Sequence, residues 1–141
     1  MKLDKDQIKK IIPHREPFLF LDYIDIIEKD SIGIGYVKFL TDNYFFVGHF
    51  PDNPIVPGVI LVEALAQSAC VVCGQKYADQ NKSVLFMSLN SVKFRKPVKP
   101  NEDITLHVKK LHQVKNVYKF SGLVKRNNEV VTESIFTAMI F

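Results

Sequence analysis

The stretch that decides the fold runs from residue 48 to residue 67 and reads GHFPDNPIVPGVILVEALAQ. Its second half is almost entirely apolar, which predicts a helix that begins near Gly58 and runs to about Tyr77. A helix that is apolar on most sides cannot lie on the surface of a protein, because its side chains need other elements to cover them. This stretch therefore predicts a domain built around one long central helix.

The segments on either side of this helix supply its cover. The sequence predicts a short amphipathic helix that ends at Pro13, a loop with an aromatic cluster before the long helix, and a tight turn at Asn127-Asn128. Period-two alternation of apolar and polar residues, clearest after residue 103, predicts half-buried strands. The strands are expected at 23–28, 32–40, 84–94, 103–112, 117–125 and 130–141.

These elements favour an α+β fold. The strands follow one another through short turns, which favours an antiparallel sheet over β-α-β units. At 141 residues, of which 47% are hydrophobic, the chain is long enough for one domain with a real core. We expect a single domain over 1–141, in which about six strands wrap the central helix.

The sequence also bears on location. Residues 1–10 lack the continuous apolar stretch of a signal peptide, so a cytoplasmic location is expected. The window 56–73 is nearly as long as a membrane span. Glu63 and Gln67 lie in its middle, where polar groups are costly in lipid. A buried helix explains the window better than a membrane helix does.

Cys70 and Cys73 form a C-x-x-C pair, a spacing that also occurs in redox and metal sites. Here they lie one turn apart in an apolar helix, with no second cysteine pair and no nearby histidine to complete four ligands. Free cysteine is among the most buried residue types. We interpret both as packing residues and expect no metal site.

Positive charge is concentrated in the C-terminal half. The formal net charge is +4, and residues 93–126 contain ten Lys and Arg against two acidic residues. Such a surface attracts an acidic protein, a nucleic acid or a phosphorylated ligand, and it is often only a solvated face. No recognition helix or base-stacking motif accompanies the charge, which disfavours nucleic-acid binding.

Glu63 and Gln67 are four residues apart, so they project from one face of the helix. An apolar environment disfavours the charged form of a carboxyl group, which prepares Glu63 to act as an acid near neutral pH. From the helix alone, a structural carboxylate held by hydrogen bonds explains Glu63 equally well.

His49 lies in a loop stiffened by three prolines, the last of which, Pro57, precedes the helix. Histidine is the side chain most easily set to accept a proton near pH 7, although a loop histidine bonded only to backbone is the more common case. The helix start offers the unpaired N–H groups of Gly58 and Val59, which would stabilise an enolate-like charge. An acid and a base in one pocket indicate elimination or hydration.

With these residues in place, the chain resembles the (3R)-hydroxyacyl-[acyl-carrier-protein] dehydratases of fatty acid synthesis, FabZ type. The resemblance spans nearly the whole chain. It is most specific at the GHFPxxPIxPGV stretch beginning at Gly48 and at the EAxAQ stretch beginning at Glu63. Supporting matches are IPHRxPFL from Ile12 and FRxPVxP from Phe94.

The resemblance implies a hotdog fold, in which a curved antiparallel sheet wraps the helix, and a lyase that needs no cofactor or metal. It implies a homodimer at least, usually a homohexamer built as a trimer of dimers. Each site would take His49 from one subunit and Glu63 from the other. The Gly58 N–H, with Val59 beside it, would hold the thioester carbonyl, and Gln67, Phe50 and Pro57 would support the site.

The substrate implied by the resemblance is a 3-hydroxyacyl chain on acyl carrier protein, and the product is the trans-2-enoyl form. An acidic carrier protein would be steered by positive charge on this chain. The candidate docking residues are Lys93, Arg95, Lys96 and Lys99. For each of them, a solvated strand edge is an equal alternative.

A contrast with a related type, one departure from the family pattern and two alternative functions remain. The related FabA type, which also isomerises the double bond, typically has aspartate where this chain has Glu63, so glutamate favours a plain dehydratase, although some proteins with the glutamate pattern also isomerise. Asn101-Glu102 replaces the family's usual Gly-Asp, and Asn tolerates a left-handed turn. The alternatives are an acyl-CoA thioesterase, which would leave His49 unexplained, and an acyl-binding module without catalysis.

Overall fold

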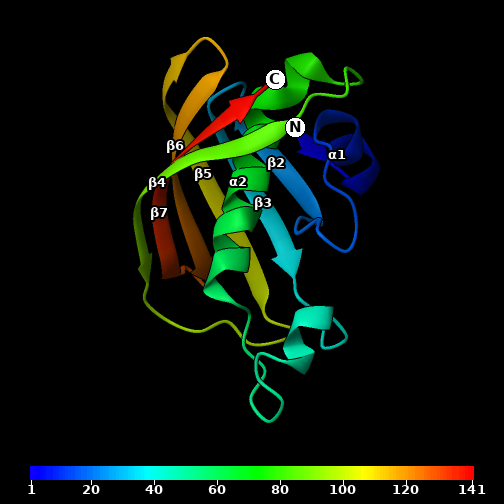
Figure 1. Cartoon of the computed structure of the whole chain (residues 1–141), viewed down its shortest axis with the longest axis vertical. Helices are drawn as coiled ribbons and strands as arrows, with labels where there is room; N and C mark the ends of the chain where they lie inside the picture. The colour runs from blue at the N-terminus through cyan, green and yellow to red at the C-terminus, as the bar shows by residue number, and fades with distance from the viewer.

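A single helix runs through the centre of the molecule, and a curved sheet wraps around it (Figure 1). The computed structural model describes residues 1–141. The central helix, α2, spans Gly58–Gly74 and continues as one 3-10 turn, η2, over Gln75–Tyr77. Fourteen of the seventeen α2 residues are buried, as expected of a helix covered on most sides. The predicted helix and the hotdog arrangement are confirmed.

The sheet contains seven antiparallel strands in the order β1-β2-β3-β5-β6-β7-β4. The six predicted strands are all present, with ends that differ by at most two residues. The seventh strand, β1, is only two residues long, which is too short for an alternation pattern to reveal. The strands are β1 Lys2–Leu3, β2 Tyr23–Glu28, β3 Ile32–Lys38, β4 Val84–Phe94, β5 Asp103–Val114, β6 Val117–Arg126 and β7 Glu129–Ile140.

The N-terminal helix α1, Lys5–Ile11, forms where it is predicted. Asp4 caps it by accepting a hydrogen bond from the Gln7 N–H, and the Gln7 side chain accepts in return from the Asp4 N–H. This reciprocal capping box satisfies two N–H groups that the helix leaves unpaired. Ile8 is fully buried and carries α1 onto the core.

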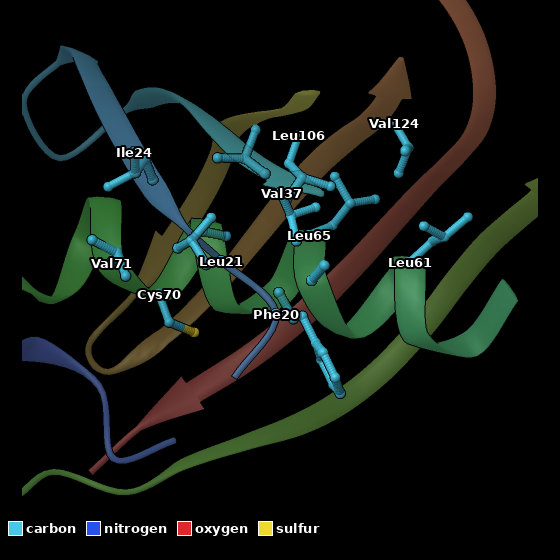
Figure 2. Close-up of a cluster of buried hydrophobic side chains, with 14 of the residues drawn as sticks. Phe20, Leu21, Ile24, Val37, Leu61, Leu65, Cys70, Val71, Leu106 and Val124 are labelled. Atoms are coloured by element: carbon cyan, nitrogen blue, oxygen red, sulfur yellow. The ribbon is translucent and has the colours of Figure 1, made fainter. Parts of the chain in front are cut away.

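The core fills the space between α2 and the concave face of the sheet (Figure 2). Leu61 and Leu65 point from α2 toward Leu106 of β5 and Val124 of β6, and all four are essentially inaccessible to solvent. Full burial of such a side chain contributes about 1.5–3 kcal/mol. A Cβ atom on Gly122 of β6 would lie 2.9 Å from Leu65, so the absence of a side chain there lets the sheet approach the helix.

The turns follow the sequence expectations. Asn127 and Asn128 both have positive φ, 50° and 63°, in the tight connection between β6 and β7. Asn101 has a φ of 68°, so the Asn that replaces the family's glycine adopts the left-handed conformation that the turn requires. The loop over 41–57 contains one unpredicted element, the 3-10 helix η1 at Tyr44–Val47. A single 3-10 turn is too short to show a period.

Strand β4 differs from the other long strands because it lies at the edge of the sheet and its apolar side chains are exposed. Leu85, Phe86, Met87 and Leu89 are each 40–53% exposed. Two register shifts interrupt its pairing with β7. An edge strand that is long and apolar is an open template for a further strand.

The segment Gly58–Tyr77 is long and apolar enough to cross a membrane by length and composition. In the structure, 72% of its most apolar window is buried inside the domain. The segment is therefore the core helix of this fold, as the sequence predicts.

Candidate active site

His49 is held in a small hairpin of backbone within the loop that precedes α2. The Ile55 N–H donates to the His49 carbonyl at 3.0 Å, and Phe50 and Asn53 exchange two backbone hydrogen bonds inside this ring. The His49 Nδ1 lies 2.9 Å from the Ile55 carbonyl oxygen. Since a carbonyl only accepts, Nδ1 carries the ring proton and Nε2 keeps a lone pair. The loop thus presents His49 in the tautomer of a base.

The ring of Phe50 supports His49 from one side. The two rings stack with centroids 4.1 Å apart and an interplanar angle of 23°. Together with the Nδ1 hydrogen bond, this contact limits the orientations open to the imidazole.

A cavity of about 450 Å³ opens beside His49. Three parts of the chain line it: the approach to α2 and its first turn (residues 55–59 and Leu61), the end of β4 with the residues after it (94–98), and Thr132 of β7. The Val56 N–H donates to the Val98 carbonyl at 2.8 Å, which ties the first two parts together. A cavity of this size, with few polar groups and one base, is typical of a small-molecule site.

The N-terminus of α2 faces this cavity. Pro57 occupies the N-cap position and provides no side-chain cap, so the N–H groups of Gly58 and Val59 have no acceptor in the chain. These groups and the helix dipole favour negative charge at this point. The two backbone donors expected from the sequence therefore lie in the same cavity as His49.

Phe94 covers the start of the helix. A Cβ atom on Gly58 would lie 2.5 Å from the Phe94 ring, and Phe94 is itself 55% exposed at the cavity wall. Gly58 is thus required for this close approach rather than for an unusual backbone angle. The sequence shows the glycine but not the ring that fills its missing side chain.

Glu63 lies on α2 with its carboxyl group turned away from bulk water, and its side chain is 17% exposed. Its Oε1 accepts from the Gln67 Nε2 at 3.2 Å, which confirms that the two side chains share one face. A second group, the His14 Nε2, lies 3.5 Å from the same oxygen. The sequence motif contains His14, but no pattern near it indicates contact with Glu63.

Gln67 joins Glu63 to the segment that precedes β2. Its side chain is almost fully buried. Its amide donates to the Phe18 carbonyl at 3.1 Å, and its oxygen accepts from the Phe20 N–H at 2.8 Å. Gln67 therefore fixes the position of Glu63 relative to a part of the chain that is almost fifty residues away.

His49 and Glu63 do not share a cavity within one chain. Glu63 faces a separate hollow of about 30 Å³, lined also by His14, Ala66, Val84, Phe86 and Ala138. His49 and the free N–H groups line the larger cavity. Each half of the expected acid–base pair is thus built, but a single subunit leaves the two halves apart.

The four basic residues expected to dock a partner lie along one exposed strip, and two of them line the His49 cavity. Arg95 bonds Glu133 at 3.2 Å, and Lys96 bonds Glu129 at 2.6 Å. Lys93 and Lys99 form no ion pair, although Glu133 lies opposite Lys93 in the pairing of β4 with β7. The strip is therefore less positive than its sequence suggests.

The two cysteines pack in the hydrophobic core. Cys70 and Cys73 are free and buried, and their side chains come from successive turns of α2. Burial raises the pKa of the Cys70 thiol far above its usual value and raises the pKa of Cys73 to about 11. Both thiols thus stay protonated at neutral pH and are poor nucleophiles.

Comparison with known proteins places this site in a family context. Residues 12–135 match the model of the FabA-like domain family. A 3-hydroxyacyl-[acyl-carrier-protein] dehydratase FabZ of Sinorhizobium medicae is 39% identical over 137 residues, which cover 97% of this chain and 89% of that protein. A protein of the same name from Rhizobium etli is 40% identical over 134 residues, which cover 95% of this chain and 86% of that protein.

Solved structures share the fold at low sequence identity. The dehydratase heterocomplex ApeI:P of Xenorhabdus doucetiae aligns with a TM-score of 0.76 at 15% identity, covering 94% of this chain and 90% of that chain. An uncharacterized protein from Pyrococcus horikoshii, PH1136, aligns with a TM-score of 0.70 at 14% identity, covering 94% and 92%. At these identities the similarity bears on the arrangement of helix and sheet alone.

Proposed function

This chain belongs to the FabA-like family and, within it, to the FabZ-type 3-hydroxyacyl-[acyl-carrier-protein] dehydratases, and from that membership we propose how it works. It removes water from a (3R)-hydroxyacyl chain on acyl carrier protein and leaves the trans-2-enoyl chain, a step of fatty acid elongation. His49 is the base and Glu63 is the acid. The observation that carries this assignment is the His49 tautomer, whose Nε2 is free beside an open helix N-terminus.

The chemistry follows from these groups. The thioester carbonyl oxygen accepts from the N–H groups of Gly58 and Val59, which stabilise the negative charge that develops on it. His49 Nε2 removes the proton from the carbon next to the carbonyl, and the electron pair of that C–H bond forms the new double bond. The bond from carbon 3 to its hydroxyl breaks, and Glu63 donates a proton to the departing oxygen, directly or through a water. Each positioned acid or base typically contributes about 10²- to 10⁴-fold in rate.

The separation of the two halves supports a shared site in a dimer. In this proposal, His49 of one subunit works with Glu63 of the other, and Gln67, Phe50 and Pro57 hold the two groups in place. Strand β4 supports the pairing, because its free edge and exposed Phe86 and Leu89 offer a large apolar surface to a second copy. Three such dimers form the proposed hexamer.

Docking of the carrier protein is the next part of the proposal. Arg95 and Lys96 line the His49 cavity, and Lys93 and Lys99 flank them in the sequence, where the four would guide an acidic carrier toward the site. Lys93 and Lys99 form no ion pair within the chain and are the stronger candidates. We further propose that the protein works in the cytoplasm, with the burial of α2 as support against a membrane location.

The first experiment follows the ultraviolet absorbance of crotonyl carrier protein or crotonyl-CoA mixed with the wild-type protein, with His49→Ala and with Glu63→Gln. We expect the absorbance of the enoyl thioester to fall through hydration with the wild type, and the rate to drop by about 10²-fold or more in each variant. Release of free thiol would instead identify a thioesterase. If no change occurred with the wild type, a binding module without catalysis would replace the proposal.

Subunit complementation tests the shared site. His49→Ala and Glu63→Gln are co-expressed in equal amounts, so that one site in four combines an intact His49 with an intact Glu63 from the opposite chain. The mixture is expected to recover about a quarter of the wild-type rate, although each parent is nearly inactive. If both groups came from one chain, every site would carry one substitution, and the mixture would be as inactive as its parents.

Charge reversal tests the docking strip. In Lys93→Glu/Lys99→Glu, the KM for carrier-bound substrate is expected to rise several-fold at low salt and to approach the wild-type value as salt screens the charges. The KM for crotonyl-CoA at high salt serves as the control and should not change. An unchanged KM for the carrier-bound substrate at low salt would exclude these residues from docking.

A further inference from the structure

His14 has surroundings that its place in the chain does not predict. It lies in the segment between α1 and β2, yet its ring reaches α2, where Nε2 is 3.5 Å from the Glu63 Oε1. Its side chain is 15% exposed, and its Nδ1 is buried without any hydrogen-bond partner. A buried polar atom without a partner is rare in proteins and calls for an explanation.

The two oxygens of Glu63 differ in their contacts. The amide of Gln67 and the ring of His14 both approach Oε1, whereas Oε2 receives no hydrogen bond within the chain. Gln67 has no donor left to give, because its second N–H binds the Phe18 carbonyl. His14 is therefore the second group able to restrain the carboxyl, and it leaves Oε2 free.

The unpartnered Nδ1 bears on where His14 carries its proton. A proton on Nδ1 would create a buried N–H donor with no acceptor. Leaving Nδ1 as an unprotonated acceptor costs less free energy than burying such an unpaired donor. Of the two neutral tautomers, the favoured one thus carries its proton on Nε2, the ring nitrogen 3.5 Å from the Glu63 Oε1. A neutral donor orients the carboxyl group without forcing it into the charged form, which a cationic neighbour would do.

From these contacts we propose that His14 is a positioning residue for Glu63. It restrains Oε1 together with Gln67, so that Oε2 carries the acidic proton and faces the departing hydroxyl. The distance of 3.5 Å is long for a hydrogen bond, and catalytic hydrogen bonds in unliganded sites often shorten when substrate binds. This inference rests on the proposed function, because it takes Glu63 as the acid.

The test compares three substitutions that differ in reach. Gln places an amide N–H near the position of the imidazole Nε2, Asn is one methylene too short to reach Glu63, and Leu keeps bulk without a donor. In His14→Leu and His14→Asn, kcat for crotonyl thioester hydration is expected to fall about tenfold with KM unchanged. In His14→Gln, kcat should stay within about twofold of the wild type. If His14 acted only in folding, His14→Gln and His14→Asn would have similar kcat values.

A double substitution shows whether His14 acts through Glu63. His14→Asn/Glu63→Gln is expected to have the same residual rate as Glu63→Gln alone, because the group that His14 orients is already lost. An additive tenfold loss would overturn the proposal, and so would full activity of His14→Asn or equal impairment of His14→Asn and His14→Gln. Failure of the proposed function would look different. In that case the wild-type protein would not hydrate the crotonyl thioester, or Glu63→Gln would hydrate it at the wild-type rate.

Discussion

His49 and Glu63 are held in opposite ways, although the proposed reaction needs both. Every group that orients His49 lies within six residues of it, in a loop at the end of the molecule remote from both chain termini (Figure 1). Glu63 stands on the buried helix α2 and depends on Gln67, which is bonded to Phe18 and Phe20 in a distant part of the sequence. One group is oriented by its own loop, and the other by the whole fold.

This difference predicts where a substitution changes both the free energy of unfolding and the reaction rate. A change near Glu63 disturbs buried packing and hydrogen bonds, so it alters both the free energy of unfolding and the rate. A change near His49 alters a solvent-facing loop, so it alters the rate with little effect on unfolding. Substitutions of graded severity can test this contrast.

The largest expected effect comes from Leu65→Ala, which removes a fully buried side chain next to Gly122. The free energy of unfolding is expected to fall by about 2–5 kcal/mol, because a cavity replaces packed methyl groups. Urea denaturation measures it. Val59→Ala, on the same helix but 71% exposed, is the stability control and should change it by less than about 0.5 kcal/mol. Similar losses in the two variants would refute the burial argument.

Gln67→Leu is expected to weaken both properties. It leaves the buried Phe20 N–H without an acceptor, which costs about 1–3 kcal/mol of unfolding free energy, and it removes a donor from Glu63. We expect kcat to fall about tenfold as well. Stability and rate are measured on the same samples, with Gln80→Leu, an exposed change, as control. A variant with reduced stability but full activity would show that Glu63 does not need this support.

Pro54→Ala addresses the other side of the contrast. Alanine gives the unfolded chain more conformational entropy than proline does, so the free energy of unfolding should fall by only about 0.4–1 kcal/mol. The rate is expected to fall several-fold, because His49 is less well oriented. Steady-state hydration kinetics give this value, and Pro100→Ala outside the loop provides the comparison. A loss of stability as large as that of Gln67→Leu would remove the distinction between the two regions.

The smallest effect is expected at Glu129, which lies exposed on the surface. The hydrogen bond from Lys96 holds the pKa of this carboxyl below its usual 4.5, and the bond from Arg126 adds to it. A lowered pKa in the folded state means that the stabilisation is present above pH 4.5 and is lost as the pH falls through the folded-state value. In Glu129→Gln, stability should depend less on pH below 4.5. Thermal unfolding at pH 3 and pH 7 measures this, and an unchanged acid dependence would contradict it.

The sequence predicts the fold more completely than it predicts the site. Helix α2 and the six long strands have strong patterns, and each was placed within about two residues. The pairing of Gln67 with Glu63 was also predictable, because helix geometry alone brings positions four apart together. His49 was identified through local loop chemistry, which needs no long-range contact.

The features of the site that the sequence does not reveal depend on distant contacts. Nothing near His14 indicates that its ring reaches Glu63, and nothing near Gly58 indicates that Phe94 covers it. The ion pairs that reduce the charge of Arg95 and Lys96 join β7 to the segment after β4. Such contacts arise from the order of strands in the sheet, which periodicity alone does not determine.

The contact between Gly58 and Phe94 has an evolutionary consequence. The Phe94 ring occupies the space that any side chain at position 58 would need, so the two positions cannot vary independently. Alanine at position 58 requires the half-exposed Phe94 ring to shift or a smaller residue at position 94, and a smaller residue at position 94 alone leaves space above the helix start. Mutant libraries aimed at new acyl substrates should therefore randomise these two codons together, because the space available at one position depends on the residue at the other.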